Sequence, residues 1–445
     1  VFFNTAEALG VATGLPGDRT YFRSNSPYEL DAKAVFGEAY YNMTDNFKWT
    51  LGLRYTDDQK SQKNTPSLLL EPVGPAGAYD DQGQLNGEFE AGPVQEASFQ
   101  EVTGRFGFDW QLGEFGPTDE SLLYAFISRG YKGGGINPPQ SAGLVEVKNS
   151  FDPEFINAFE VGTKSTLFDG AGQLNLAAFY YDYKGYQISS IVNRSSINEN
   201  VDAKVSGFEA EFYWQMTNNF RVDTTLGLLS AKLKDQALLD TYDQTGGDPD
   251  WLIVKDAATT QNCVASAAGV AALLAATAGT PLAGTPALIC NTGPTGLNAT
   301  LATFLGQAAA DALTPALAPN GIMTDVSDNS LPRAPDTTLS VGAQYEMELG
   351  QNWSTILRGD FYYQSDMYSR IFNLEADKID SWQNANASLT FINDGAGLEV
   401  ELYVKNLLED DQITSQYLTD ASSGLYTNIF TLEPRQFGIR VGKSW

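Results

Sequence analysis

The chain has 445 residues, of which 42% are hydrophobic and 12% aromatic, and its formal net charge is −28. Such an acidic balance argues against a nucleic-acid partner, which requires a basic face. The chain contains no histidine, the commonest general base and metal ligand, so we expect neither an enzyme nor a metal site or cofactor. A mean hydropathy of −0.24 does not exclude a membrane protein, because membrane strands place apolar residues only at alternate positions.

Alternation of apolar and polar residues is the dominant pattern, and it predicts β-strands. Between positions 49 and 55 the odd residues are Trp, Leu, Leu and Tyr, whereas the even ones are small or polar. About thirteen such strands are predicted, centred near residues 36, 52, 105, 125, 161, 178, 209, 226, 342, 358, 388, 402 and 438. A soluble β-sandwich would alternate too, so this pattern alone does not place the chain in a membrane.

The predicted connections alternate between short and long. Short turns rich in Gly, Asn and Asp lie at 43–46, 113–119, 168–172, 216–219, 348–352 and 393–397. Longer connections lie at about 60–97, 132–151, 190–200, 235–330, 370–378 and 408–426. Tight turns on one rim and long loops on the other are typical of outer-membrane barrels. The sequence therefore predicts an all-β, transmembrane antiparallel β-barrel in the bacterial outer membrane, in contact with lipid and lipopolysaccharide.

The last predicted strand indicates the orientation. Phe437, Ile439, Val441 and Trp445 share one face, and barrels place such an aromatic end residue at the membrane interface. A strand that ends in an aromatic also resembles the terminal signal of bacterial barrel assembly. Counting back from a periplasmic end places every long connection outside the cell.

The longest connection, 235–330, contains both cysteines of the chain, Cys263 and Cys290. A disulfide in an oxidising compartment suits them better than a metal site. The segment between them has no charge, but Pro281 and Pro286 argue against a transmembrane helix. We instead expect short helices at 264–276 and 300–313 in an extracellular lid.

An acidic group in the same connection has two interpretations. Its members are Asp240, Asp243, Asp248 and Asp250. Clustered carboxylates are calcium ligands in many loops, but a solvated loop without metal is the favoured interpretation.

Five sequence blocks resemble the TonB-dependent receptors, and siderophore receptors in particular. They are Ser128–Asn137 (SRGYKGGGIN), Phe159–Lys164 (FEVGTK), Ala178–Tyr183 (AFYYDY), Val404–Asp410 (VKNLLED) and Arg435–Gly442 (RQFGIRVG). Their order and spacing place residues 30–445 in that family.

The resemblance implies a larger assembly than this sequence holds. Members have about 22 strands and a plug domain, whose short motif engages the TonB energy-transducing protein. About nine strands, the plug and that motif have no counterpart here, so residues 1–445 are expected to be a portion of the barrel. The remainder would lie on the same chain, beyond this sequence, or on another chain.

The resemblance also implies a function, active uptake of a scarce nutrient such as a ferric siderophore-type chelate through the lumen. We expect ligand contacts at Tyr131, Lys132, Gly133, Gly134, Gly135, Tyr417 and Tyr426, with Tyr183 and Tyr186 adding aromatic surface. Eight charged residues are expected to face the lumen: Arg54, Arg105, Arg358, Arg440, Glu209, Glu211, Glu399 and Glu401. There they would contact the plug, line the transport path or simply hydrate a polar interior.

Two alternatives stay open at this point. A passive porin-like channel would need neither plug nor energy. A surface barrel for adhesion or partner binding would use the long disulfide-clamped loop. The sequence does not identify the substrate, because loops diverge fastest in such proteins.

Overall fold

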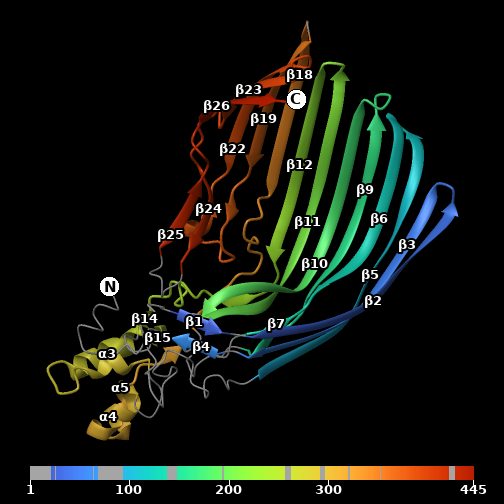
Figure 1. The fold of residues 1–445 in the computed structure, drawn as a ribbon. Helices are drawn as coiled ribbons and strands as arrows, with labels where there is room; N and C mark the ends of the chain where they lie inside the picture. Colours follow the sequence, from blue (N-terminus) through green and yellow to red (C-terminus); the bar gives the residue numbers. More distant parts are fainter. Residues whose placement is uncertain are drawn as a thin grey trace, which may run out of the picture.

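A computed structural model describes residues 22–25, 27–63, 65–68, 94–137, 148–192, 195–255, 262–290, 296–318, 321–350, 352–419 and 426–444. Its main feature is a 13-stranded antiparallel sheet whose strands follow one another in chain order (Figure 1). The strands are β2 (Tyr28–Thr44), β3 (Phe47–Lys63), β5 (Val94–Phe115), β6 (Thr118–Lys132), β9 (Glu154–Leu167), β10 (Gly172–Val192), β11 (Ser195–Thr217), β12 (Phe220–Leu233), β18 (Thr337–Gly350), β19 (Trp353–Gln364), β22 (Trp382–Asn393), β23 (Leu398–Lys405) and β26 (Gln436–Lys443). Each predicted strand centre falls inside one of them, so the predicted all-β antiparallel fold is confirmed.

Tight turns join consecutive strands at one end of the sheet, along the upper and right-hand rim in Figure 1. All six predicted short turns lie there. In the turn from β9 to β10, Phe168, Asp169 and Gly170 have φ angles of 61°, 56° and 83°. Aspartate and glycine tolerate this left-handed region better than other residues, which explains the Asp-Gly signal in the sequence.

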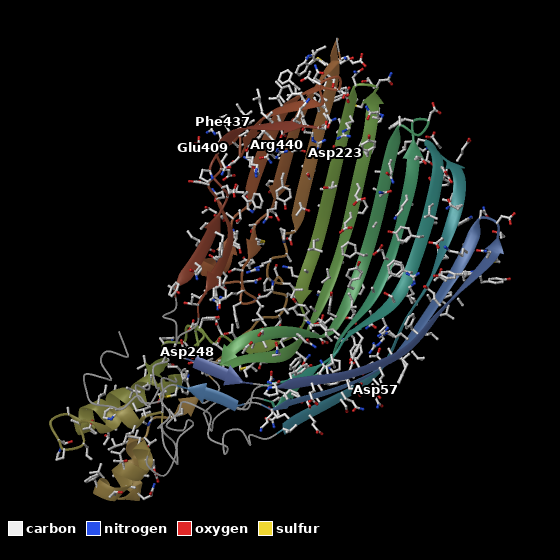
Figure 2. All side chains as sticks on the ribbon, in the orientation of Figure 1. Asp57, Asp223, Asp248, Glu409, Phe437 and Arg440 are labelled. Carbon is white, nitrogen blue, oxygen red and sulfur yellow. A yellow bond between two sulfur atoms is a disulfide. The ribbon has the colours of Figure 1, made fainter. Side chains whose placement is uncertain are left out.

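The two faces of the sheet differ in polarity because side chains alternate along each strand. One face, which we call the outer face, carries an exposed apolar band. Val35, Leu53 and Phe437, for example, are 71%, 56% and 76% exposed. Figure 2 labels Phe437. On β3 the band ends at Tyr55, and Asp57 follows it on the same face. The opposite, inner face carries charged pairs, and this contrast is typical of membrane barrels.

The sheet is a curved wall with two edges, β2 and β26 (Figure 1). Among the described residues, β2 pairs only with β3 and β26 only with β23. Bare strand edges are not tolerated in lipid, because their backbone groups lack partners there. The additional strands expected from the family resemblance stay a prediction.

Short elements gather at the opposite, loop end of the sheet. The strands are β1 (Phe22–Asn25), β4 (Thr65–Leu68), β7 (Gly135–Ile136), β8 (Ser150–Phe151), β13 (Ala237–Leu239), β14 (Trp251–Lys255), β15 (Asn262–Ser266), β16 (Leu317–Ala318), β17 (Met323–Asp325), β20 (Met367–Tyr368), β21 (Lys378–Ile379), β24 (Ile413–Leu418) and β25 (Thr427–Thr431). The helices are α3 (Ala267–Thr277), η1 (Thr285–Leu288), α4 (Leu297–Leu305), α5 (Gln307–Leu313) and η2 (Glu375–Asp377). No helix in the described ranges has both the length and the apolar character to cross a membrane.

Three sequence predictions need correction here. The helix predicted at 264–276 begins only at Ala267, because the residues before it pair as strand β15 with β14. The helix predicted at 300–313 is two helices, α4 and α5, which meet at Gly306 with a φ of 81°. The connection predicted at about 190–200 is mostly strand, since β10 and β11 stay paired as far as Val192 and Ser195.

The described part of 251–318, which we call the loop module, has its own hydrophobic core. Its buried side chains are those of Cys263, Ala265, Leu273, Ile289, Leu297, Leu301 and Ala310. A second core lies where the adjoining loop segments cover β10–β12, and its members are Val201, Ala203, Ala231, Leu233, Leu238, Val326 and Leu331. The long connection is therefore folded at its base as well as in its middle.

Candidate functional site

A pocket of about 420 Å³ lies at the loop end, and we call it the mouth pocket. The tips of β10 and β11, strand β13, the segment after β20 and strand β24 all contribute to its wall. Glu199 of β11 lines it and shares a strand face with Glu209 and Glu211. That shared face is the inner one. Glu209 is paired with Gly227 of β12, and Gly227 lies four residues from Asp223, an inner-face residue of the same strand. The pocket therefore opens at the loop-end mouth of the inner face.

Arg370 of the mouth-pocket wall is half-buried and contacts two buried carboxylates. Its Nε donates to Asp377 Oδ1 at 2.6 Å, and its Nη1 donates to Asp240 Oδ1 at 3.0 Å. The Asp377 and Asp240 side chains are only 4% and 3% exposed. The guanidinium also lies over the rings of Tyr242 and Phe372, at 5.0 Å and 5.6 Å from their centroids. One arginine thus joins the long connection to the β19–β22 connection.

Gln416 of β24 ties a third segment to this wall. Its Nε2 donates to Ser369 Oγ at 3.0 Å and to the Ala376 carbonyl at 2.9 Å. The predicted ligand residue Tyr417 follows it, is 48% exposed and lines the pocket. Tyr426, also predicted, is 56% exposed and closes the β24–β25 hairpin through Thr419 rather than lining the pocket. The structure therefore separates the two predicted tyrosines.

The predicted group at Tyr131 to Gly135 belongs to a second feature, a strap of residues 131–137 that crosses the inner face of β3 and β5. Tyr131 Oη donates to Asp58 Oδ2 at 2.9 Å, and the Lys60 ammonium donates to the Gly134 carbonyl. The strap lies closer to the loop end of the sheet than the apolar band, which ends at Tyr55 on β3. Burial, together with the hydrogen bond to Asp58, raises the pKa of the Tyr131 phenol. Lys132 is exposed and pairs with Glu154 at 3.4 Å.

The glycines of the strap are closely packed. A Cβ atom at Gly134 would lie 2.3 Å from the Phe151 carbonyl oxygen and 2.7 Å from the Phe99 ring. At the end of the strap Asn137 is 1% exposed, and its side chain donates to the Asn198 carbonyl at 3.0 Å. The Gly-rich block is thus a packed brace between the wall and the β10–β11 tip.

The predicted lumen-facing charges all lie on the inner face. Arg105 Nε pairs with Glu38 at 2.7 Å, and Arg440 pairs with Glu401 at 3.0 Å. Arg358 contacts both Asp223 and Asp360, at 2.6 Å and 2.5 Å. Arg54, Glu209, Glu211 and Glu399 share these strand faces, and Glu211 accepts a hydrogen bond from Asn175 at 3.1 Å. Figure 2 shows Asp223 and Arg440 in the upper part of the wall.

The acidic group of the long connection is divided between two roles. Asp240 is buried against Arg370, as described above. Asp243 accepts a hydrogen bond from Thr245, and Asp248 accepts one from the backbone of Asp250, both at 2.9 Å. The described residues include no cluster of three or more acidic or cysteine side chains that could hold a metal ion.

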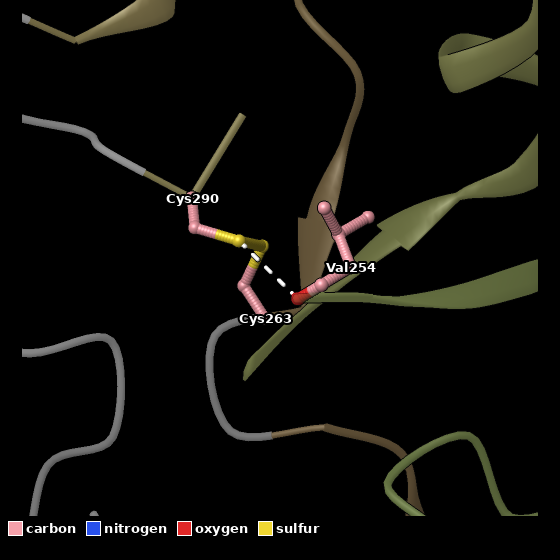
Figure 3. The surroundings of a disulfide bond; sticks show 3 residues. All are labelled: Val254, Cys263 and Cys290. Carbon is pink, nitrogen blue, oxygen red and sulfur yellow. Dashed lines mark hydrogen bonds between the residues drawn. A yellow bond between two sulfur atoms is a disulfide. The ribbon is translucent and has the colours of Figure 1, made fainter. Parts of the chain in front are cut away.

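The predicted disulfide joins Cys263 and Cys290, whose Cα atoms are 5.5 Å apart (Figure 3). Cys290 Sγ also contacts the Val254 carbonyl of β14. The bond therefore clamps the helical part of the loop module to its small sheet.

Sequence reasoning missed Arg370, Asp377 and Gln416. They lie in short elements and connections with too few residues to show a periodic pattern. Asp240 is 130 positions from Arg370, and Ser369 is 47 positions from Gln416. The only available signal was an arginine in a short connection otherwise rich in apolar residues, positions 367–374.

An antiparallel sheet with an exposed apolar outer band, an ion-paired inner face, tight turns at one end and folded loops at the other defines an outer-membrane β-barrel protein. The family model "TonB dependent receptor-like, beta-barrel" matches residues 3–407. The chain belongs to this family, whose members are proteins of the bacterial outer membrane, and the predicted resemblance is confirmed.

Curated relatives match about half of the chain. The pesticin receptor of Yersinia enterocolitica is 26% identical over 237 residues, which are 53% of this chain and 31% of that receptor. The metal-pseudopaline receptor of Pseudomonas aeruginosa is 24% identical over 258 residues, 54% of this chain and 32% of that receptor. The matched segment thus spans about a third of each relative.

Solved structures share the fold over nearly the whole chain. The ferric yersiniabactin uptake receptor of Yersinia pestis has a TM-score of 0.59 at 15% identity, and covers 95% of this chain and 46% of its own. The siderophore receptor PiuA of Acinetobacter baumannii has a TM-score of 0.55 at 13% identity, with coverage of 94% and 43%. The chain therefore spans somewhat less than half of these receptors, all of which are named as receptors rather than enzymes.

Proposed function

We propose that this chain forms the mouth and part of the wall of an active transporter, which takes up a scarce metal chelate through the outer membrane with TonB-relayed energy. A ferric siderophore-type chelate is the first ligand to test. The observation that carries the proposal is the mouth pocket, a mostly apolar recess on the inner face with Arg333, Arg370 and Glu199 in its wall. A recess whose surface is mostly apolar, with charged and hydroxyl groups in its wall, suits a small-molecule ligand.

Similar proteins support the choice of ligand. Among the two curated relatives and two solved structures above, one is named for metal-pseudopaline, one for ferric yersiniabactin and one for a siderophore. In this proposal the ligand first rests in the mouth pocket and then moves along the inner face. The plug and the TonB contact that the family resemblance implies would lie on the same chain, beyond this sequence, or on another chain.

The test is uptake by cells that express the whole protein as their only receptor. A panel of ⁵⁵Fe-loaded chelates is offered, and both surface binding and uptake are measured with and without an uncoupler. We expect uptake of at least one chelate to stop when the uncoupler is added. Tyr417→Ala should weaken binding of that chelate several-fold, because it removes a ring from the pocket wall. Tyr426→Ala is the matched control on the same hairpin and should have little effect.

Two outcomes would contradict the proposal. Uptake that continues in the presence of the uncoupler would indicate a passive channel. Equal losses for the Tyr417 and Tyr426 variants would mean that the mouth pocket is not the binding site.

A second function, binding of a partner protein at the cell surface, is favoured by one observation. The loop module has its own core and disulfide, yet Leu274 of α3 and Phe304 of α4 are 51% and 66% exposed. Replacing residues 251–318 by a short linker should abolish partner binding and leave chelate uptake intact. Loss of uptake in that variant would instead assign the module to transport.

A further inference from the structure

Six aromatic side chains form a stripe on the inner face of β6 and β10, and we call it the inner aromatic stripe. Its members are Tyr124, Phe126, Phe179, Tyr181, Tyr183 and Tyr186. Strand register places them on one face, because Phe126 and Phe179 are both directly opposite Glu160 of the intervening strand β9. All six are half-buried.

A β-bulge extends the stripe toward the loop end. Tyr183 and Tyr186 are an odd number of residues apart, so a regular strand would place them on opposite faces. The register shifts between them, where Gly185 has a φ of 65°. Their rings therefore meet edge to face, with centroids 5.6 Å apart. The bulge keeps a second tyrosine on the inner face at the height where the mouth pocket begins.

Neighbouring glycines let two of the rings lie across the adjacent strand. A Cβ atom at Gly162 of β9 would be 2.6 Å from the phenol oxygen of Tyr124. A Cβ atom at Gly207 of β11 would be 2.4 Å from the ring of Phe179. The tips of these two rings therefore lie over the glycines of the adjacent strands.

A shared carboxylate holds the two central phenols. Glu160 accepts a hydrogen bond from Tyr124 Oη at 2.9 Å and another from Tyr181 Oη at 3.1 Å. Phe179 stacks with Tyr181 at a centroid distance of 4.8 Å. The rings on β6 and β10 are therefore joined across β9 as one surface. Glu209, exposed on the inner face of β11, adds a second carboxylate beside it.

The stripe is continuous with the mouth pocket. Tyr183 and Tyr186 pack against the core beneath the loops, as do Ile371 and Phe372. The last two residues also line the mouth pocket. A ligand that leaves the pocket along the inner face would meet the stripe next.

We propose that the inner aromatic stripe is a transfer track, along which an aryl-bearing metal chelate stacks as it moves from the mouth pocket into the lumen. The inference rests on the proposed function and adds the class of chelate to it. Ring faces attract flat aromatic and apolar groups. The two carboxylates beside the rings disfavour a chelate with a net negative charge.

The decisive comparison is between neighbouring residues of one strand. Tyr181→Leu removes a ring from the inner face, while Tyr180→Leu removes a 47%-exposed ring from the outer face. Leucine preserves apolar bulk in both variants. A second inner-face variant combines Tyr181→Leu with Phe179→Leu. Each is made in the whole protein and expressed in cells without other receptors.

Two uncharged ⁵⁵Fe probes are used, one with phenolate aryl groups and a trihydroxamate without any. Surface binding is measured in de-energised cells and the initial rate of uptake in energised cells. Each lost ring face should slow uptake of the aryl probe by roughly two- to tenfold, with binding at the mouth unchanged within twofold. Tyr180→Leu should leave both readouts at the wild-type level, and trihydroxamate uptake should not respond to any variant.

Other results overturn the track. The track would be overturned if the double variant took up the aryl probe at the wild-type rate. It would also be overturned if the wild type took up only the trihydroxamate. Equal losses of binding and uptake would assign the rings to the mouth site instead. Entry of a large antibiotic such as vancomycin into the variants would show that the rings pack against the plug. Failure of the wild type to take up the aryl probe would also overturn the track, whereas uptake that ignores an uncoupler would refute the proposed function itself.

Discussion

Arg370 offers a sharp test of how the loops are held, because it is the shared partner of two carboxylates that are almost fully buried. Replacing it by methionine leaves Asp240 and Asp377 without a counter-charge. Removing one partner of a buried pair costs about 3 kcal/mol or more. The effect should be local, since these residues join loops to one another and not the strands of the wall.

Native-state hydrogen exchange of the purified protein measures the local opening free energy. The Asp377 amide donates to the Leu374 carbonyl and the Ser369 amide to the Asp377 carbonyl, both at 2.8 Å, so they report on this loop. A loss of about 3 kcal/mol corresponds to exchange about 150-fold faster. Amides in the middle of β10 and β11 should exchange as in the wild type.

Lys378→Met is the matched control, because Lys378 pairs with Asp366 in the same connection at 3.5 Å but that pair is far more exposed. In this variant the Ser369 and Asp377 amides should exchange at rates within threefold of the wild type. Combining Arg370→Met with Asp240→Asn and Asp377→Asn should recover part of the loss, since no buried charge is then left unpaired. The reasoning fails if Arg370→Met changes exchange by less than threefold, or if the wall amides change equally.

Three further predictions concern other parts of the loop end. Replacing both Cys263 and Cys290 by serine removes a disulfide that joins residues 27 positions apart, and this should lower the stability of the loop module by about 3.5 kcal/mol. Thermolysin should then cut within 262–318 much faster than in the wild type and leave the strand hairpins intact. Hydrogen bonds from Asn298 and then Gln307 lower the pKa of Asp311 below its ordinary value of 3.8, so the stabilisation is complete above pH 3.8 and is lost as the pH falls through the lowered pKa. Exchange of the α4–α5 amides should therefore accelerate in acid in the wild type, whereas Asp311→Asn should show no such transition. Gly134→Ala should lower the stability of the strap by about 1–3 kcal/mol, because the new methyl group would clash with the Phe151 backbone and the Phe99 ring. Gly359→Ala is the control, since its added methyl group has no atom within 4 Å. Equal thermal stability of the two variants would contradict the predicted clash.

Local sequence features determined the elements of this protein. Alternation has a period of two residues whatever surrounds a strand, and turns such as Phe168–Gly172 need residues that accept left-handed backbone. All thirteen strands of the main sheet and its six turns could therefore be predicted. The disulfide could be predicted because the chain has only two cysteines. The final aromatic, Trp445, lies outside the described residues, as do parts of the predicted connections at 60–97 and 132–151.

The tertiary structure alone decided how the loops are used. Arg370 meets Asp240 across 130 positions of sequence, and no local pattern encodes such a contact. The bulge at Gly185 moves Tyr186 to the same face as Tyr183, against the regular alternation of side chains along a strand. Periodicity specifies which face a residue takes within a regular element, whereas a site is built where regular elements end, from side chains that only the folded chain brings together.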